Sequence, residues 1–184
     1  MKYFITLFFT LVMLACIVSC DYDNKENTDI FRNWIGKKIT IPENIDIKIL
    51  GEEITDKNII NKKNKIFVYV DSLGCTACNM ELGAWILRIT DLYDSGIEIP
   101  VLFSVHSNDY SGLEKELSSM YFECPIIYDY NNDIERLNKF PAKKEYRTFL
   151  LDEENNVILI GAPTHNDKLW ELYKRQIREL TAKE

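Results

Sequence analysis

The feature that most constrains the fold lies at residues 65–94, where a short apolar run precedes a Cys-x-x-Cys pair and then helical periodicity. The run IFVYV at 66–70 is β-branched and aromatic, which is typical of a strand buried on both faces of a sheet. From 77 to 94 apolar residues recur every three or four positions, which predicts an amphipathic helix. Cys75 and Cys78 therefore stand at a strand-to-helix turn.

The rest of the chain repeats this alternation of strands and helices. Strands are predicted at 97–105 and 124–130, and helices at 108–122, 132–139 and 166–181. RTFLLD and NVILIG flank the polar turn EENN and predict an antiparallel hairpin, and β-type runs at 38–41 and 45–50 predict a second one near the N-terminus. The order predicts an α/β fold: a three-layer α/β/α sandwich whose mixed sheet has an N-terminal β-hairpin extension and an inserted βα crossover.

The first twenty residues predict the compartment. Lys2 precedes an uncharged apolar run from 3 to 18, the layout of a secretory signal peptide, and the ending IVSC resembles a bacterial lipobox whose cysteine, Cys20, is lipidated. We expect a signal peptide at 1–19, a flexible polar tether at 20–30 and a single domain at 31–184. The domain would be lipid-anchored in the cell envelope, facing the periplasm or the cell surface, where disulfides persist.

The charge balance excludes one class of partner. The chain has 22 Lys and Arg against 29 Asp and Glu, a net charge of −7 at pH 7. It contains no basic block interleaved with aromatic residues, which argues against nucleic-acid binding.

The position of the cysteine pair indicates thiol chemistry. The unpaired N–H groups and the positive dipole end of a helix N-terminus stabilise an anion, so a thiolate at Cys75 is favoured there and would be the nucleophile. Cys78, three residues later, returns to the same side of the first turn and would be the resolving thiol. A Cys-x-x-Cys between a strand and a helix inside a βαβ pattern is a strong redox signal.

The segments IFVYVDSLGCTAC, CNME and TFLLDEENNVILIG together resemble thioredoxin-fold proteins, most closely the membrane-tethered thiol–disulfide oxidoreductases of the TlpA/ResA type. The resemblance covers roughly residues 36–181, and the leader suggests a Bacteroides-type lipoprotein. It implies a thioredoxin-like domain that needs no cofactor beyond the Cys75–Cys78 disulfide. Its implied partners are a protein or small-molecule disulfide or dithiol substrate and a thiol electron donor in the membrane.

The resemblance also implies site residues beyond the cysteines. Ordinary thioredoxins carry a buried acid six residues before the first cysteine; here that residue is Tyr69, so Glu81 becomes the candidate acceptor for the Cys78 proton.

The substrate-facing loops of the family correspond to Gly74 and to Glu145, Tyr146 and Arg147. Gly74 replaces the usual tryptophan and Tyr146 the usual cis-proline. Because a non-proline cis bond costs about 3–4 kcal/mol, we expect a trans or rearranged loop at Tyr146.

The leading hypothesis is a thiol–disulfide oxidoreductase, with reduction favoured by the resemblance. One alternative is a thioredoxin-fold binding lipoprotein whose cysteine pair is structural. Another is a copper-handling chaperone in which Cys75, Cys78 and His165 hold the metal, although we expect no metal site. The odd thiol, Cys124, is expected to be a small core residue.

Overall fold

The structure is a computed structural model that describes residues 27–54, 64–73 and 80–182. The chain divides into two compact units, Met1–Trp34 and Ile35–Glu184. In the first unit residues 27–34 are helical, and four of these residues fall in the stretch for which a flexible tether is predicted. Among the described residues, no helix has the length and the apolar character that a membrane crossing requires.

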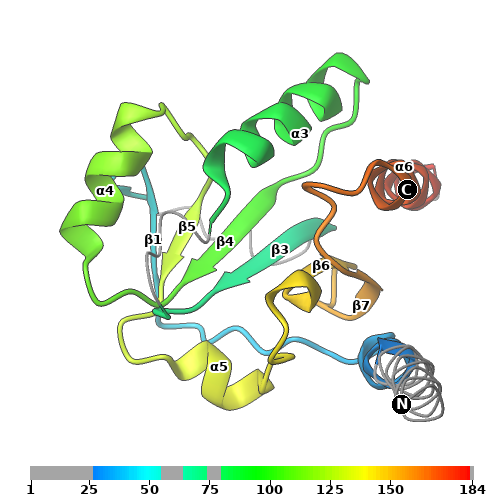
Figure 1. The fold of residues 1–184 in the computed structure, drawn as a ribbon, viewed down its shortest axis with the longest axis horizontal. Coiled ribbons are helices and arrows are strands. Elements are labelled where there is room, and N and C mark those ends of the chain that lie inside the picture. The colour runs from blue at the N-terminus through cyan, green and yellow to red at the C-terminus, as the bar shows by residue number, and fades with distance from the viewer. Residues whose placement is uncertain (1–26, 55–63, 74–79, 183–184) are drawn as a thin grey trace, which may run out of the picture. The chain divides into compact units, whose positions relative to one another are not determined.

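The second unit is built on one sheet with the strand order β2-β1-β5-β4-β3-β6-β7 (Figure 1). β3, β4 and β5 are parallel, whereas β1 pairs antiparallel with β2 and β5, and β6 pairs antiparallel with β3 and β7. The predicted mixed sheet and the crossover between β4 and β5 are confirmed. The N-terminal extension is a hairpin as predicted, but the run at 45–50 pairs with β2 and not with the run at 38–41. The strands are β1 (Asp46–Ile49), β2 (Glu52–Glu53), β3 (Lys65–Val70), β4 (Val101–Val105), β5 (Ile126–Tyr128), β6 (Thr148–Leu151) and β7 (Val157–Ile160).

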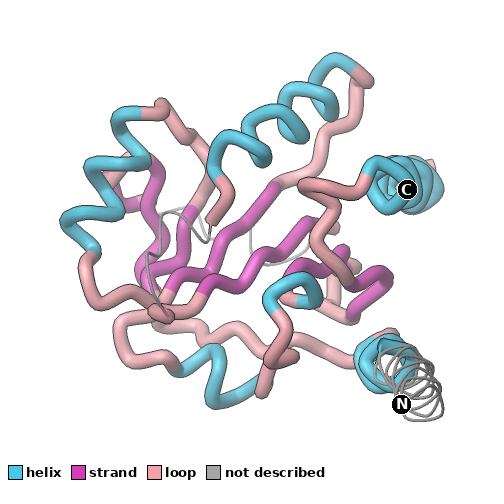
Figure 2. Tube along the Cα trace, in the orientation of Figure 1, coloured by secondary structure: helices cyan, strands magenta, loops and turns pink. Residues whose placement is uncertain are grey.

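Helices cover both faces of this sheet, which confirms the three-layer prediction (Figures 1 and 2). They are α3 (Leu82–Asp94), α4 (Tyr110–Ser119), α5 (Asp133–Asn138), α6 (Asp167–Thr181) and the 3-10 turn η2 (Lys144–Tyr146). α3, α4 and α6 share one apolar cluster with alternate residues of the central strands, such as Val68 and Phe103. On the opposite face Phe140, just after α5, packs on Phe67 and stacks on Tyr69, with ring centroids 6.1 and 4.5 Å apart.

Helices α4 and α6 each begin at a polar residue that directly precedes them in the sequence. The Asp109 carboxylate accepts from the Gly112 N–H at 2.8 Å and caps α4, and the Asn166 side chain accepts from the Leu169 N–H at 3.0 Å and caps α6. Each satisfies an N–H that has no partner within the helix, which explains where these helices start.

β4 is shorter than the predicted strand at 97–105, because the end of α3 uses the preceding backbone. Gly96, with φ 65°, donates to the Tyr93 carbonyl and Ile97 donates to the Leu92 carbonyl, which is a Schellman ending. Pro100 then lacks an N–H, and pairing begins only at Val101.

Two further boundaries differ from the sequence prediction. Of the described residues in the helix predicted from residue 77, α3 includes only those from Leu82, because Glu81 has left-handed backbone angles (φ 52°, ψ 43°) that an α-helix does not contain. The β-type run at 38–41 forms no strand; Lys38 makes one isolated bridge to Asn156, beside the start of β7. The predicted strand at 124–130 is paired only over Ile126–Tyr128.

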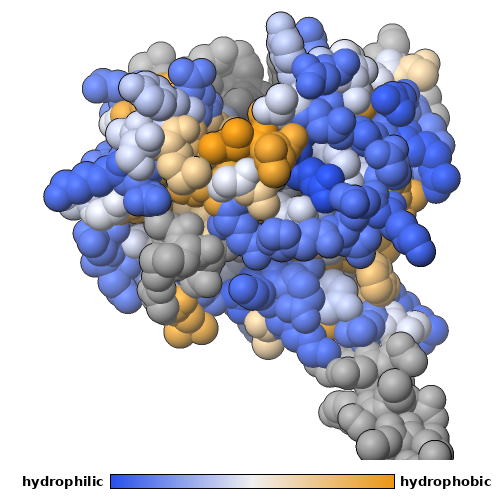
Figure 3. All heavy atoms as spheres, turned by 45° about the horizontal axis from the view of Figure 1, so that its top comes forward, coloured by the Kyte–Doolittle hydropathy of each residue, from blue (hydrophilic) through white to orange (hydrophobic). Residues whose placement is uncertain are grey.

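The surface reflects the sequence composition. The face shown in Figure 3 is mostly hydrophilic and carries one compact group of apolar side chains near its centre.

Lys65, the first residue of β3, yields a prediction about pH. Lys65 is fully buried. Burial lowers the pKa of its ammonium group from 10.5 to about 8, although the negative charges of Asp152, Glu153 and Glu154 act to raise it. Between pH 8 and 10.5 the unfolded chain therefore holds more protons than the folded chain, so stability rises with pH. From pH 8 to 9.5, urea denaturation should show a rise of about 1–2 kcal/mol.

Lys65→Met should abolish this rise, because the titrating group is gone. Lys115→Met, an exposed lysine on α4, is the matched control and should keep the rise. An unchanged slope in Lys65→Met would contradict the assignment.

Candidate functional site

A cavity of about 340 Å³ lies at the carboxyl end of β3. Its described walls come from the end of β3 with its following loop, the start of α3, and the loop that leads into β6. The described lining residues are Val68, Tyr69, Val70, Asp71, Leu73, Met80, Glu81, Trp85, Ala142, Lys144, Glu145, Arg147 and Thr148. Buried apolar side chains and charged side chains thus line the same cavity.

Arg147 organises the loop side of the cavity. Its guanidinium pairs with the Asp71 carboxylate and donates to the Pro141 carbonyl at 2.7 Å and the Ala142 carbonyl at 3.0 Å. The side chains of Arg147 and Asp71 are only 14% and 19% exposed. Asp71 also accepts from the Leu73 N–H at 3.1 Å, so it joins the β3 loop to the β6 loop.

Tyr69 occupies the position where the resemblance implies a buried acid. It is buried, its hydroxyl donates to the Asn132 side chain at 3.1 Å, and the Arg147 guanidinium lies 5.7 Å from the centre of its ring. Burial, together with the negative charges of Glu135 and Asp71, raises the pKa of Tyr69. Tyr69 therefore stays protonated at neutral pH and supplies no base.

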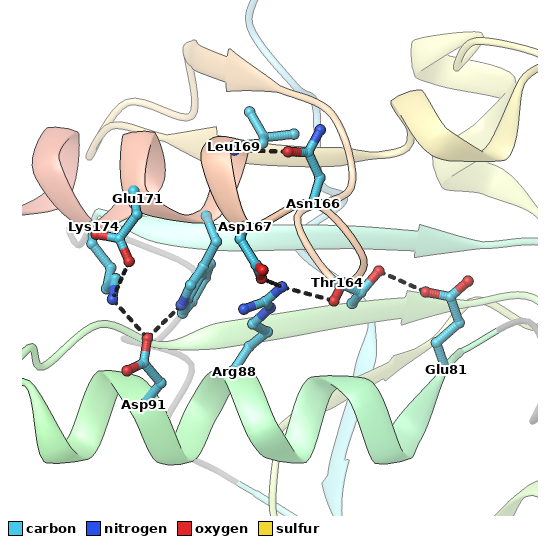
Figure 4. A network of polar contacts seen from close by, with 10 residues as sticks. Glu81, Arg88, Asp91, Thr164, Asn166, Asp167, Leu169, Glu171 and Lys174 are labelled. Atoms are coloured by element: carbon cyan, nitrogen blue, oxygen red, sulfur yellow. Dashed lines mark hydrogen bonds and ion pairs between the residues drawn. The ribbon is translucent and has the colours of Figure 1, made fainter.

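Glu81 lies on the opposite wall, directly before α3. Its carboxylate accepts from the Thr164 hydroxyl at 2.6 Å (Figure 4). The same carboxylate lies 3.4 Å from Nε2 of His165. The Glu81 side chain is 29% exposed, whereas that of His165 is 73% exposed. A carboxylate at this wall can accept a proton from a group in the cavity.

The predicted site residues divide into three groups. Glu81, Glu145 and Arg147 line the same cavity. Tyr146 ends η2 and is not among the described residues that line the cavity, and no cis peptide bond occurs in the described chain, which confirms the trans expectation there. The remaining site residues, Cys20, Gly74, Cys75 and Cys78, lie outside the described residues.

The other parallel strands end in structural contacts. His106 follows β4, and its Nδ1 lies 2.8 Å from the Asp129 carbonyl. Asp129 follows β5, and its carboxylate accepts from the N–H groups of Asp133 and Ile134 at the start of α5. His106 therefore belongs to the scaffold at this end of the sheet.

The copper alternative is not tested directly, since two of its three ligands lie outside the described residues. Within the described chain, no three His, Cys, Asp or Glu side chains are close enough together to hold a metal ion. Cys124 is a free thiol that packs against the main apolar cluster, as expected for a core residue. The residue as a whole is partly exposed.

Solved structures with the same arrangement identify the fold. The thioredoxin domain of a Bacteroides vulgatus thiol–disulfide oxidoreductase matches with a TM-score of 0.57 at 13% identity, over 78% of this chain and 97% of that one. A candidate thiol:disulfide interchange protein, DsbE, from Chlorobium tepidum matches with a TM-score of 0.53 at 14% identity, over 76% and 96%. The chain has a thioredoxin-like fold.

The same fold occurs in a second kind of redox protein. A mutant of Xylella fastidiosa PrxQ matches with a TM-score of 0.56 at 12% identity, over 77% of this chain and 96% of that one. No protein-family model and no curated protein matches the sequence.

Several residues of the candidate site were not predicted. Lys144 and Trp85 line the cavity, and Thr164 holds Glu81. No motif marks them, because each reaches the site through a tertiary contact. Asp71 accepts from the Leu73 N–H, and its pairing with Arg147 spans 76 positions.

The Asp71–Arg147 pair predicts a measurable coupling. Removing either partner leaves a partly buried charge, so a double-mutant cycle of Asp71→Ala and Arg147→Ala should give about 1–3 kcal/mol of coupling by urea denaturation. The Asp133–Arg136 pair, 41% and 68% exposed, is the control and should give less than about 1 kcal/mol. Equal couplings would show that Asp71–Arg147 behaves as a surface pair.

Cys124 predicts a difference in thiol reactivity. Burial, with a smaller effect from Glu123, raises its pKa to about 12. Because the thiolate is the reactive form, iodoacetamide at pH 8 should alkylate Cys124 at least about 100-fold more slowly in the folded chain than in urea. The measurement uses a variant with serine at every other cysteine; similar rates would contradict a buried thiol.

Proposed function

We propose that this protein is an extracytoplasmic, lipid-anchored thiol–disulfide oxidoreductase that acts as a reductase, in which Cys75 and Cys78 form the redox pair. The observation that carries the proposal is that the two described residues that flank the Cys-x-x-Cys segment, Leu73 and Met80, both line the cavity at the end of β3.

Covalent reach supports this location for the chemistry. Two residues of chain span at most about 7 Å. Cys75 is two residues from Leu73, and Cys78 is two residues from Met80. Each cysteine is therefore within two residues of a side chain that lines the cavity, which supports this location for the pair.

The cavity carries, among its described lining residues, two cations beside three carboxylates. Lys144 and Arg147 line it, and positive charge lowers a thiol pKa. Arg147 is committed to Asp71 and two carbonyls, which leaves Lys144, exposed on η2, as the cation that we assign to Cys75. The regular part of α3 starts at Leu82, so its dipole acts from the Glu81 side of the cavity.

The proposed reaction has two exchange steps. The Cys75 thiolate attacks one sulfur of a substrate disulfide, and the other sulfur leaves as a thiolate. Cys78 loses its proton to Glu81 and attacks the Cys75 sulfur, which releases the second substrate thiol and leaves the Cys75–Cys78 disulfide. A membrane thiol donor would return two electrons and restore the dithiol.

The compartment is part of the proposal. The leader-like residues 1–19 and the lipobox-like IVSC support a domain outside the cytoplasm that is anchored through Cys20. There a dithiol protein needs a continuing supply of electrons, because the surroundings favour disulfides. The substrates would be proteins or small molecules that carry a disulfide.

The function has a direct test. The wild-type protein should reduce insulin or glutathione disulfide in the presence of dithiothreitol, while Cys75→Ser should lose at least about 100-fold because the nucleophile is gone. Cys124→Ala, which removes a thiol outside the pair, is the control and should keep the activity. The reduction potential of the pair should lie above about −300 mV, the range of exchangeable disulfides.

The same assays separate the alternatives. Equal inactivity of wild type and Cys75→Ser, with a potential below about −300 mV, would support a binding lipoprotein with a structural pair. Stoichiometric copper that is lost in His165→Ala would support metal handling. Consumption of peroxide without disulfide reduction would move the activity toward that of PrxQ-like neighbours.

A further inference from the structure

Glu81 has a backbone conformation that a glutamate seldom adopts. Its φ of 52° and ψ of 43° lie in the left-handed region, where the Cβ of an ordinary residue is crowded. Such residues persist only where surrounding contacts hold them, and they concentrate at functional sites. The contacts of Glu81 therefore bear on its role.

The backbone of Glu81 serves its helix, since its carbonyl accepts from the Trp85 N–H at 3.0 Å, but its side chain does not. At the same N-cap position of α4 and α6, Asp109 and Asn166 have φ near −135° and use their side chains to cap the first turn. Glu81 makes no side-chain cap bond to α3. Its carboxylate is directed away from its own helix, toward the loop between β7 and α6 (Figure 4).

That loop is itself fixed to α3. One nitrogen of the Arg88 guanidinium donates to the Thr164 carbonyl at 3.0 Å and to the Asp167 carboxylate at 2.7 Å. The Arg88 side chain is only 17% exposed. Thr164, whose residue is 7% exposed, is thus held by its backbone while its hydroxyl donates to Glu81.

We propose that Thr164 is a positioning residue for Glu81, which it holds at the cavity wall so that the carboxylate can take the proton of Cys78. This inference rests on the proposed function. The Cys78 thiol gives its proton to Glu81, the resulting thiolate attacks Cys75 in the mixed disulfide, and the bond between Cys75 and the substrate sulfur breaks. The substrate disulfide is the oxidant, and its second sulfur leaves as the reduced thiolate.

The role predicts an effect on one step only. Attack by Cys75 does not need Glu81, whereas resolution by Cys78 does. Removing the Thr164 hydroxyl should therefore slow resolution and leave the first attack unchanged, because a base that is no longer held in place accepts the proton less often.

The experiment uses the aromatic disulfide 5,5′-dithiobis(2-nitrobenzoate) with the reduced full-length protein in detergent, in which Cys16, Cys20 and Cys124 are replaced by alanine. Attack by Cys75 releases one coloured thiolate, and resolution by Cys78 releases a second. Stopped-flow absorbance should thus show two phases, and Cys78→Ser should retain only the first.

Thr164→Val, which replaces the hydroxyl with a methyl group, should slow the second phase about tenfold across pH 6–9 and leave the first within twofold. Thr164→Ser restores the hydroxyl and should recover the second phase to within about twofold. Thr90→Val makes the same change at an exposed site on α3 and should alter neither phase. Circular dichroism melting of each variant checks that the fold is kept.

The outcomes separate the two proposals. Absence of both phases in the reduced parent protein would overturn the proposed function itself. Two normal phases in the parent protein and in Thr164→Val would overturn the positioning role and leave the function standing. A second phase that is equally slow in Thr164→Val and Thr164→Ser would also overturn it, because the hydroxyl would not be the group that matters.

Discussion

Burial of β3 on both faces is the constraint on which the rest of the second unit depends. All six residues from Lys65 to Val70 are buried, with β4 on one side and β6 on the other. A strand of this kind is stable only if helices cover both faces of its sheet. α3 and α6 meet this need on one face, and the segment around α5 meets it on the other, so the carboxyl end of β3 emerges between covering elements at the cavity.

The parts of the fold that follow from hydrophobic periodicity could be read from the sequence. β3, the hairpin β6–β7 and α6 lie where the pattern predicts them, since a two-residue or 3.6-residue period reports directly which face is buried. The starts of α3 and β4 could not be read in this way. They depend on the left-handed angles of Glu81 and on the hydrogen bonds that Gly96 and Ile97 donate to α3, and apolar patterning records neither.

The candidate site shows the same division between local and tertiary information. The cysteine pair and Glu81 stand within seven positions and form a motif, so they could be proposed from spacing alone. Asp71 with Arg147, and Glu81 with Thr164, are joined across 76 and 83 positions. Such pairs leave no periodic signal in one sequence, and only the folded chain brings them together. The Arg88 contacts to the β7–α6 loop belong to this second kind.

The two edges of the sheet limit how a partner can approach. β2 at one edge is two exposed glutamates, Glu52 and Glu53, and the start of β7 at the other edge is already paired with the backbone of residues 36–39. A short acidic strand, and a strand whose start is already paired, leave few free backbone groups with which a foreign strand could pair. This also limits self-association into extended sheets. Recognition of a protein partner by strand addition is therefore disfavoured at both edges, and a partner that meets the ends of the strands contacts loops and side chains, where an extended peptide gains few backbone hydrogen bonds.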